Sequence, residues 1–420
     1  MSTRTMVAVA FTALAVCLAG CQPMAYLMST PLQIVRAEAS TLNAYGPDDQ
    51  MTLLYATTRQ PLMTASSRSY GEAFSAELRL GVATLRVEPE GPGARDVRAL
   101  PSLSNVRDHP TLRLEKLEER AVFEPSERLD ALNDETAKFF SDIDQALSTS
   151  ADKDVFVYVH GANNSVYRTA AQAAQYRPFT DRRSVVVAFA WPTVDNYLDY
   201  SSDLRNAQRS VPVFARFIEL LARYTRAQHI NIMAHSAGAR IVSGALASLG
   251  ADARPDRVTL RQGLRLGEVY YAAADIEIKT FVSEFKSYGD LPMRVTLQVN
   301  RGDYVLAFLG MSSGNSRAGR PNFDELSEAE RTSLWDWTAA SRLDIVDVSS
   351  ERAGDLPGGA HAFWYERRWV SSDVVLEFVY HAPPAQRGLN ATDKDGLKRW
   401  VFPSDYEQRS AAATGRLLGQ

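Results

Sequence analysis

The sequence predicts an α/β fold with a mostly parallel central sheet that is covered by helices on both faces. After residue 155, short runs that are apolar nearly throughout alternate with longer segments of helical character, for example 184–191 followed by 207–224. Strands that are apolar on both faces are typical of parallel sheets buried between two layers of helices. A serine at the turn between one strand and the helix after it is the third observation that favours this class.

The first part of the chain is expected to hold a leader, a tether and the outer strands. Residues 1–20 are predicted to be a signal peptide and residues 21–50 a tether. The folded domain is predicted over 51–383, with strands at 51–57 and 78–87 and a helix around 129–147. Proline, glycine and charge make 88–110 an expected exposed connection, and weak patterning makes 384–420 an expected peripheral C-terminal tail.

The beginning of the chain is typical of a bacterial lipoprotein. An apolar run at 6–19, too short to span a bilayer comfortably, ends in Leu18-Ala19-Gly20-Cys21. We expect cleavage before Cys21 and diacylglyceryl attachment to its thiol; an ordinary signal peptide with a stray cysteine is the alternative. Gln22 is not the aspartate that resembles an inner-membrane retention signal. In a Gram-negative cell, the expected location is therefore the outer membrane, facing the periplasm.

Composition excludes several classes of function. Hydrophobic residues make up 45% of the chain and charged residues 23%, as in ordinary globular proteins. The net charge of -4 offers no electrostatic argument for nucleic-acid binding. Cys17 would leave with the leader and Cys21 would be lipidated, which excludes a disulfide framework, a cysteine nucleophile and a thiolate metal site. The histidines form no familiar ligand spacing with carboxylates, so neither a metal nor another cofactor is expected.

The strongest functional signal surrounds Ser236. A β-branched run at 228–232 precedes it and an alanine-rich segment at 240–249 follows, so the serine occupies the apex of a strand, turn and helix. Such a turn lifts Oγ above the sheet edge and directs the N–H of Ala237 toward a developing oxyanion. The alternative is a serine that merely caps a helix. His235, inside the turn, is expected to be structural.

A second strand supplies the other half of the expected oxyanion site. The hydrophobic run 154–159 continues directly into His160-Gly161. A strand that runs into His-Gly ahead of the serine matches the loop that provides the second oxyanion donor in serine hydrolases with such a sheet. The N–H of Ala162 is the predicted donor, with Asn163 as the less favoured alternative.

The catalytic base can be found by elimination, because in this architecture the histidine follows the serine and the acid in the chain. Only His361 and His381 lie after Ser236. His361 sits in the turn-rich loop 356–363, from which a base can reach the serine, and is favoured. His381 ends the periodic segment 371–380, where a histidine is a favourable partner of the helix dipole.

Two aspartates compete for the role of the acid, which fixes the imidazole tautomer and stabilises the imidazolium. Asp275 follows the strand 268–274, and Asp303 follows the strand segment 293–302. If the serine follows the fifth strand, these are the sixth and the seventh, and the acid usually follows the seventh. Asp303 is therefore favoured and Asp275 is the alternative acid. The aspartate that is not used is expected to cap the next helix.

Several pieces of the chain together resemble one known family. They are Tyr55-Ala56-Thr57-Thr58-Arg59, Val159 to Asn164, Ala190-Trp191-Pro192, Tyr200 with Asp203, Ala234 to Gly238, Ala273-Ala274-Asp275, Asn300 to Asp303 and the His361 loop. Over roughly 51–380 the chain is similar to the bacterial α/β-hydrolase family of unknown physiological function within the esterase/lipase superfamily. The resemblance implies the α/β-hydrolase fold and a triad of Ser236, His361 and one aspartate, but no substrate. Ala237 departs from the methionine that the family more often shows, which affects pocket shape rather than chemistry.

The sequence therefore predicts a lipid-anchored serine hydrolase. Esters of small molecules or lipids are favoured over amides by analogy, because most relatives by fold are treated as esterases or lipases. An amidase or peptidase is the nearer alternative. A non-catalytic envelope lipoprotein that binds a glycan, lipid or protein is the more distant one. The expected partners are the substrate and the membrane that holds the anchor, with no nucleic acid.

Overall fold

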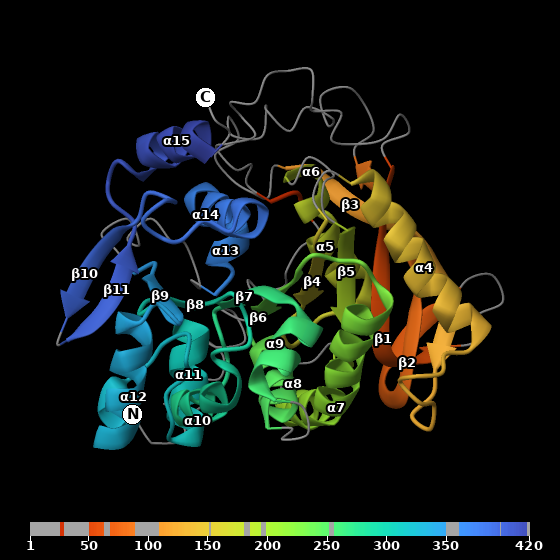
Figure 1. The fold of residues 1–420 in the computed structure, drawn as a ribbon, viewed down its shortest axis with the longest axis horizontal. Helices are drawn as coiled ribbons and strands as arrows, with labels where there is room; N and C mark the ends of the chain where they lie inside the picture. Colours follow the sequence, from red (N-terminus) through yellow and green to blue (C-terminus); the bar gives the residue numbers. More distant parts are fainter. Residues whose placement is uncertain are drawn as a thin grey trace, which may run out of the picture.

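The central feature of the molecule is an 11-stranded sheet in the order β10-β11-β9-β8-β7-β6-β4-β5-β1-β2-β3 (Figure 1). The structure is a computed structural model that describes residues 26–28, 50–62, 68–88, 109–150, 153–179, 185–194, 199–251, 256–349, 361–394 and 396–417. The strands from β11 to β1 run parallel, whereas β2, β3 and β10 add antiparallel strands at the two edges. The predicted α/β class with a mostly parallel sheet is confirmed.

Most of the predicted strands and helices are present, with boundaries shifted by a few residues. The strands are β1 Gln50–Leu62, β2 Ser69–Glu88, β3 Thr111–Phe123, β4 Val155–Val159, β5 Val185–Ala190, β6 Ile230–His235, β7 Leu266–Ala272, β8 Arg294–Val299, β9 Leu343–Asp347, β10 Asn390–Lys394 and β11 Leu397–Val401. The helices are α4 Asp134–Thr149, α5 Val166–Ala174, α6 Tyr176–Phe179, α7 Tyr200–Tyr224, α8 Gly238–Gly250, α9 Arg257–Leu264, α10 Ile278–Tyr288, α11 Tyr304–Ser313, α12 Glu328–Ala339, α13 Phe363–Glu366, α14 Arg368–Tyr380 and α15 Tyr406–Leu417.

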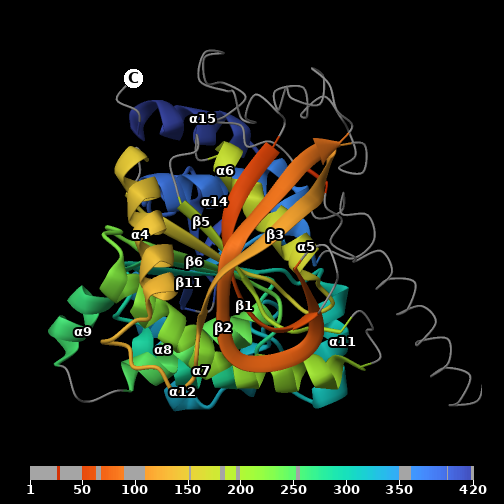
Figure 2. The same ribbon diagram turned by 90° about the vertical axis from the view of Figure 1, so that its right-hand side faces the viewer.

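Helices cover both faces of the sheet, and each face has its own hydrophobic core. Side chains of α4, α7, α8, α10 and α12 pack on one face, and those of α5, α6, α13, α14 and α15 pack on the other. β4 shows why its sequence reads as apolar throughout. Val155 and Val157 point into the first core while Phe156 and Tyr158 point into the second, because side chains alternate along a strand. The edge made by β1, β2 and β3 faces the viewer in Figure 2.

One strand at this edge was not predicted. β3 carries alternating acidic and basic side chains, which disguise its apolar positions. Two bulges in its pairing with β2 also break the alternation, so that Leu117 packs into one core and Phe123 into the other. Because β3 precedes it, the strand before Ser236 is the sixth in the chain and not the fifth.

The C-terminal segment differs from the expected peripheral tail. β11 pairs in parallel with β9, β10 pairs with β11, and α15 follows them. The indole of Trp400 is buried, and its Nε1 donates a hydrogen bond to Asp344 at 3.0 Å. The expectation of a tail over 384–420 was wrong because strands of only five residues at a sheet edge have little apolar periodicity of their own.

The predicted leader, Cys21 and most of the predicted tether and exposed connection lie outside the described residues. Within the described ranges, we find no helix that combines the length and apolar character needed to cross a bilayer.

Candidate active site

Ser236 lies in the tight turn between β6 and α8, as the sequence predicts. Its φ of 52° is in the left-handed region that a residue with a Cβ seldom adopts, and such strain persists only where the surroundings impose it. Here three backbone hydrogen bonds do so. The N–H of Ser236 donates to Ala272 at 3.0 Å, and its carbonyl accepts from Ala239 and Asp275, each at 3.0 Å. The turn is thus held from both β7 and α8.

Two glycines allow the β4 loop to approach this turn closely. A Cβ on Gly161 would fall 2.7 Å from Cβ of Ser236, and a Cβ on Gly238 would fall 2.5 Å from the carbonyl oxygen of His160. Real Cβ atoms are not found that close to other heavy atoms. Glycine is therefore required at both positions by the contact between the two loops, which the sequence alone does not reveal.

His361 lies beside Ser236 and joins it to Asp303. Nε2 of His361 is 2.8 Å from Oγ of Ser236, and Nδ1 of His361 is 2.8 Å from Oδ2 of Asp303. All three side chains are buried. The other carboxylate oxygen of Asp303 accepts the N–H of Leu306 at 2.9 Å and so caps α11. Asp303 is therefore fixed by its own helix while it contacts the imidazole.

Asp275 makes no hydrogen bond to His361 and lies behind the serine turn. Its carboxylate is 2.9 Å from Nε of Arg317, and its backbone N–H donates to Ser236. Burial raises the pKa of the Asp275 carboxyl to about 7 although Arg317 lowers it. The expectation that the second aspartate caps a helix is not met, because Glu277 precedes α10. Asp275 instead braces the turn.

The surroundings of His361 favour its charged form. Burial by itself lowers the pKa of this imidazole, but the charge and hydrogen bond of Asp303 raise the pKa above its ordinary value of 6.5. His235 lies against the backbone of His361, with Nε2 3.4 Å from the His361 carbonyl oxygen. Burial, followed by the charge of His361, lowers the pKa of His235 to about 3, so His235 is neutral at physiological pH.

The backbone N–H groups of Ala237 and Ala162 lie near Ser236, the first by sequence and the second through the β4 loop. Ala237 directly follows Ser236, and Ala162 follows Gly161, whose position touches the serine. Within the described part of the chain, neither the N–H of Ala162 nor that of Ala237 donates to another backbone carbonyl outside regular elements. Both groups remain candidates for an oxyanion site.

A buried polar network behind the β4 loop was not predicted. Nη2 of Arg59 donates to the carbonyl of Asn164 at 2.7 Å and to Oγ1 of Thr193 at 3.1 Å. The carboxylate of Asp203 accepts the N–H of Asn163 at 3.2 Å and that of Val194 at 2.8 Å. Burial raises the pKa of Asp203 to about 6, against the backbone donors that lower it. The loop after β4 is thereby tied to β1, α7 and the end of β5.

Trp191 belongs to the same bracing and is fully buried. Its ring stacks on His160 with centroids 5.2 Å apart, and its Nε1 donates to the His160 carbonyl at 2.7 Å. Nε2 of His160 lies 3.1 Å from the Trp191 carbonyl oxygen. The two residues hold the ends of β4 and β5 together, so the role of Trp191 is structural. The sequence shows only that His160 and Trp191 each directly follow an apolar run.

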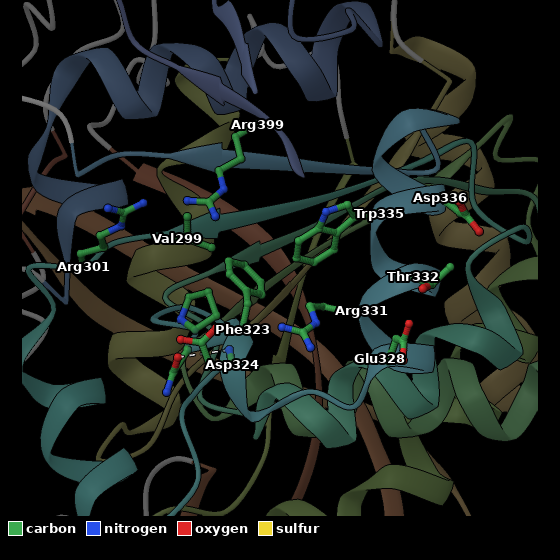
Figure 3. Close-up of a pocket in the computed structure, with 12 residues that line it drawn as sticks. Val299, Arg301, Phe323, Asp324, Glu328, Arg331, Thr332, Trp335, Asp336 and Arg399 are labelled. Atoms are coloured by element: carbon green, nitrogen blue, oxygen red, sulfur yellow. Dashed lines mark hydrogen bonds between the residues drawn. The ribbon is translucent and has the colours of Figure 1, made fainter. Parts of the chain in front are cut away.

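A cavity of about 700 Å³ lies further along the carboxyl edge of the sheet (Figure 3). Its wall includes Arg301, Arg331 and Arg399 together with an edge-to-face pair of Phe323 and Trp335. The guanidinium of Arg399 lies 5.1 Å above the Phe323 ring. The side chains of Ser236, His361 and Asp303 are not among the described residues that line this cavity.

Comparison with known proteins adds one match. A family model described as "Alpha/beta hydrolase of unknown function (DUF900)" matches residues 135–367, more than half of the 420 residues, and this range contains Ser236, Asp303 and His361. No curated protein matches the chain.

Proposed function

Since the chain belongs to this α/β-hydrolase family of unknown function, we propose that it is a serine hydrolase that cleaves carboxylic esters. Ser236 is the nucleophile, His361 the general base and Asp303 the residue that orients the imidazole. The N–H groups of Ala162 and Ala237 hold the oxyanion. One observation carries the proposal: two hydrogen bonds of 2.8 Å link these three side chains in sequence, next to a serine held at positive φ.

The reaction proceeds in two halves. Nε2 of His361 takes the Ser236 proton as Oγ attacks the ester carbonyl carbon, and the tetrahedral oxyanion forms against the two backbone donors. The C–O bond to the alcohol then breaks, and His361 returns the proton to the departing alkoxide. In the second half, His361 takes a proton from water as the water oxygen attacks the acyl carbon. The bond from that carbon to Oγ of Ser236 then breaks, His361 returns the proton to Oγ, and the acid leaves. The carboxylate of Asp303 stabilises the imidazolium in both halves and stays ionised.

The choice of esters rests on analogy with the fold, and the site geometry serves amides by the same steps. An amide demands protonation of a poorer leaving group, so the two substrate classes are separable by rate. We expect acyl esters to turn over faster than the matching amides.

We also propose that the chain is a lipoprotein of the cell envelope, anchored through Cys21 to the outer membrane on its periplasmic side. The motif Leu18-Ala19-Gly20-Cys21 supports this. Feeding cells an alkyne-tagged palmitate should label the protein, and Cys21→Ser should abolish the label. Cys17→Ser, a change of the same kind inside the leader, is the matched control and should keep it.

Labelling with a fluorophosphonate probe tests the hydrolase proposal without a known substrate. The probe phosphonylates activated serines, so the purified protein should be labelled and Ser236→Ala should not. Ser201→Ala removes an exposed serine on α7 and is the matched control, which should label like the wild type. Circular dichroism of each variant checks that it is folded. A panel of p-nitrophenyl acyl esters and the matching anilides then compares the substrate classes.

The opposite result would also be informative. A folded wild-type protein that resists the probe and hydrolyses no ester would refute the hydrolase proposal. It would favour an envelope lipoprotein that uses the fold for binding. Faster cleavage of anilides than of esters would make the protein an amidase or peptidase.

A further inference from the structure

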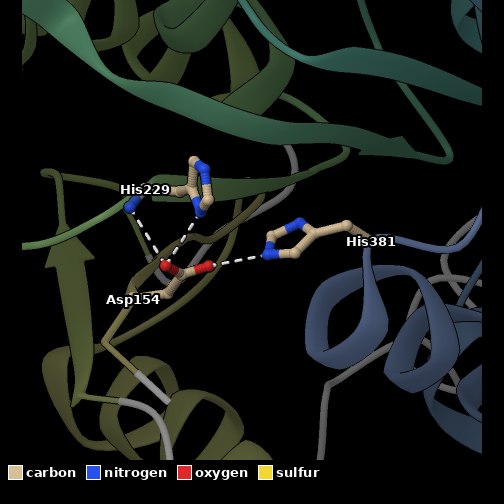
Figure 4. A group of neighbouring side chains, drawn as sticks. All are labelled: Asp154, His229 and His381. Atoms are coloured by element: carbon tan, nitrogen blue, oxygen red, sulfur yellow. Dashed lines mark hydrogen bonds and ion pairs between the residues drawn. The ribbon is translucent and has the colours of Figure 1, made fainter. Parts of the chain in front are cut away.

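Three chemically active side chains meet at the edge of the sheet opposite to Ser236. Asp154 directly precedes β4, His229 precedes β6, and His381 follows α14. Nδ1 of His229 is 3.0 Å from Oδ1 of Asp154, and Nε2 of His381 is 2.9 Å from Oδ2 of Asp154 (Figure 4). One donor atom from each residue lies within 4.8 Å of the other two. Two imidazoles and a carboxylate thus converge on one point.

No sequence pattern indicates this cluster, because its members are far apart in the chain. The fold unites them: the parallel strands β4 and β6 are direct neighbours, so the residues that precede them share the amino edge. α14 packs on one face of the sheet and ends at this amino edge, where His381 takes a left-handed φ of 48°. That backbone conformation ends the helix and places the imidazole against Asp154.

The second ring nitrogen of His381 is oriented as in metal sites. Nδ1 of His381 lies 3.2 Å from Oε1 of Glu268, a fully buried side chain. Imidazoles that bind metals almost always donate their other N–H to a carboxylate or carbonyl, which fixes the tautomer and makes the ligand more basic. Nδ2 of Asn231 donates to Asp154 at 3.0 Å and orients that carboxylate in the same way.

Buried carboxylates gather on the His381 side of this cluster, whereas the surface hollow beside His229 is lined by Arg257, Arg261, Arg265 and Arg342. Asp154, Glu268 and Asp344 are buried carboxylates, and Arg294 is shared between Glu268 at 3.4 Å and Asp344 at 3.0 Å. Arg387 contacts Asp373 and Glu377 instead. Buried carboxylates need compensating charge, which a metal ion at the histidines would supply.

We propose that Asp154, His229 and His381 bind one divalent transition-metal ion of the zinc class. Imidazole nitrogen with carboxylate oxygen is a ligand set that zinc takes, at about 2.0–2.2 Å from each atom. The donor atoms need to separate only slightly to admit an ion of this size. The imidazoles of His229 and His381 are 31% and 23% exposed, so solvent can reach the ion and complete its coordination.

The role of this ion is structural. The site lies one strand length from Ser236, about 17 Å for the five residues of β4 at ~3.3 Å each. The ion would join the end of α14 to β4 and β6. The proposal does not depend on Ser236 being a nucleophile.

Calorimetric titration of the purified protein with zinc chloride tests the proposal. We expect saturation at one ion per chain. His229→Gln and His381→Gln should each weaken zinc binding at least tenfold, and Glu268→Gln should weaken it about 10–100-fold by loosening the His381 ring. His109→Gln removes a buried histidine from another part of the molecule and should leave binding unchanged.

The proposal is overturned if the wild type shows no saturable binding near one ion per chain. It is also overturned if His229→Gln binds zinc as tightly as the wild type. The His229 side chain is partly exposed, so this variant should fold even if His381→Gln does not. Ions held loosely by surface groups would show equal binding in His109→Gln and His229→Gln.

Discussion

Replacing the carboxylates of Asp303 and Asp275 with amides, one at a time, should show which of the two aspartates serves catalysis. In Asp303→Asn, the amide oxygen can still cap α11 by accepting the N–H of Leu306, since asparagine and aspartate are equally good caps. The amide nitrogen then faces Nδ1 of His361 and donates to it. That forces the imidazole proton onto Nε2, where it points at Ser236. Nε2 then has no free lone pair and cannot accept the serine proton. The fold is kept and the base is disabled.

The expected size of this effect follows from the wrong tautomer. Such a change lowers kcat about 10⁴-fold in a Ser-His-Asp enzyme, which corresponds to about 5 kcal/mol of transition-state stabilisation. Asp275→Asn should have little effect on either kcat or stability. The pKa of Asp275 is about 7, so near neutral pH its carboxyl is already partly protonated, and the amide changes the charge beside Arg317 only in part. The kcat of this variant should fall less than about tenfold, because no hydrogen bond joins Asp275 to His361.

The assay combines two readings on each variant. The rate of fluorophosphonate labelling, together with kcat on p-nitrophenyl butyrate, reports the reactivity of Ser236, and urea unfolding reports stability. At pH 7, Asp303→Asn should lose reactivity and keep its unfolding midpoint, whereas Asp275→Asn should keep both. A larger loss of kcat in Asp275→Asn, or a wild-type rate in Asp303→Asn, would refute the assigned roles.

Three other outcomes can be measured with the same assays. Gly161→Ala should slow labelling because the new Cβ falls 2.7 Å from Cβ of Ser236. The expected loss is about 10²–10³-fold, as for loss of an oxyanion donor. The control is Gly263→Ala, whose new Cβ meets nothing within 4 Å and which should keep the wild-type rate. The acid limb of kcat/KM should have its inflection above 6.5, because the raised pKa of His361 must be exceeded to free the base, and Asp303→Asn should move the inflection lower. The pKa of Asp275 is raised from 3.8 to about 7, so the folded state holds this proton more tightly than the unfolded chain does. The free energy of unfolding should therefore fall as the pH rises from 4 to 7, and Asp275→Asn should flatten that fall in urea melts.

Local patterns predicted the parts of the molecule in which neighbours in sequence are neighbours in space. The turn at Ser236, the apolar parallel strands and the loop at Gly161 are all of this kind. The choice of His361 and Asp303 over His381 and Asp275 came from chain order, and the contacts of His361 agree with it.

Features built from distant residues could not be predicted. Arg59 meets Asn164 across 105 residues, and no periodicity marks such a contact. His381 reads as a helix-end residue, and its contacts with Asp154 depend on the register of two strands. β3 was not predicted because bulges shifted its apolar side chains between the two faces of the sheet.

The position of His361 sets when the site becomes complete during synthesis. Ser236 emerges from the ribosome 125 residues before its base, and β11, which covers the edge of β9, follows later still. Until then the serine is an ordinary alcohol, and the open edge of β9 can pair with another chain. Contacts so distant in sequence close slowly. A chain that ends before β11 is therefore exposed to aggregation, and truncation before residue 397 should yield insoluble protein even though Ser236, Asp303 and His361 are all present.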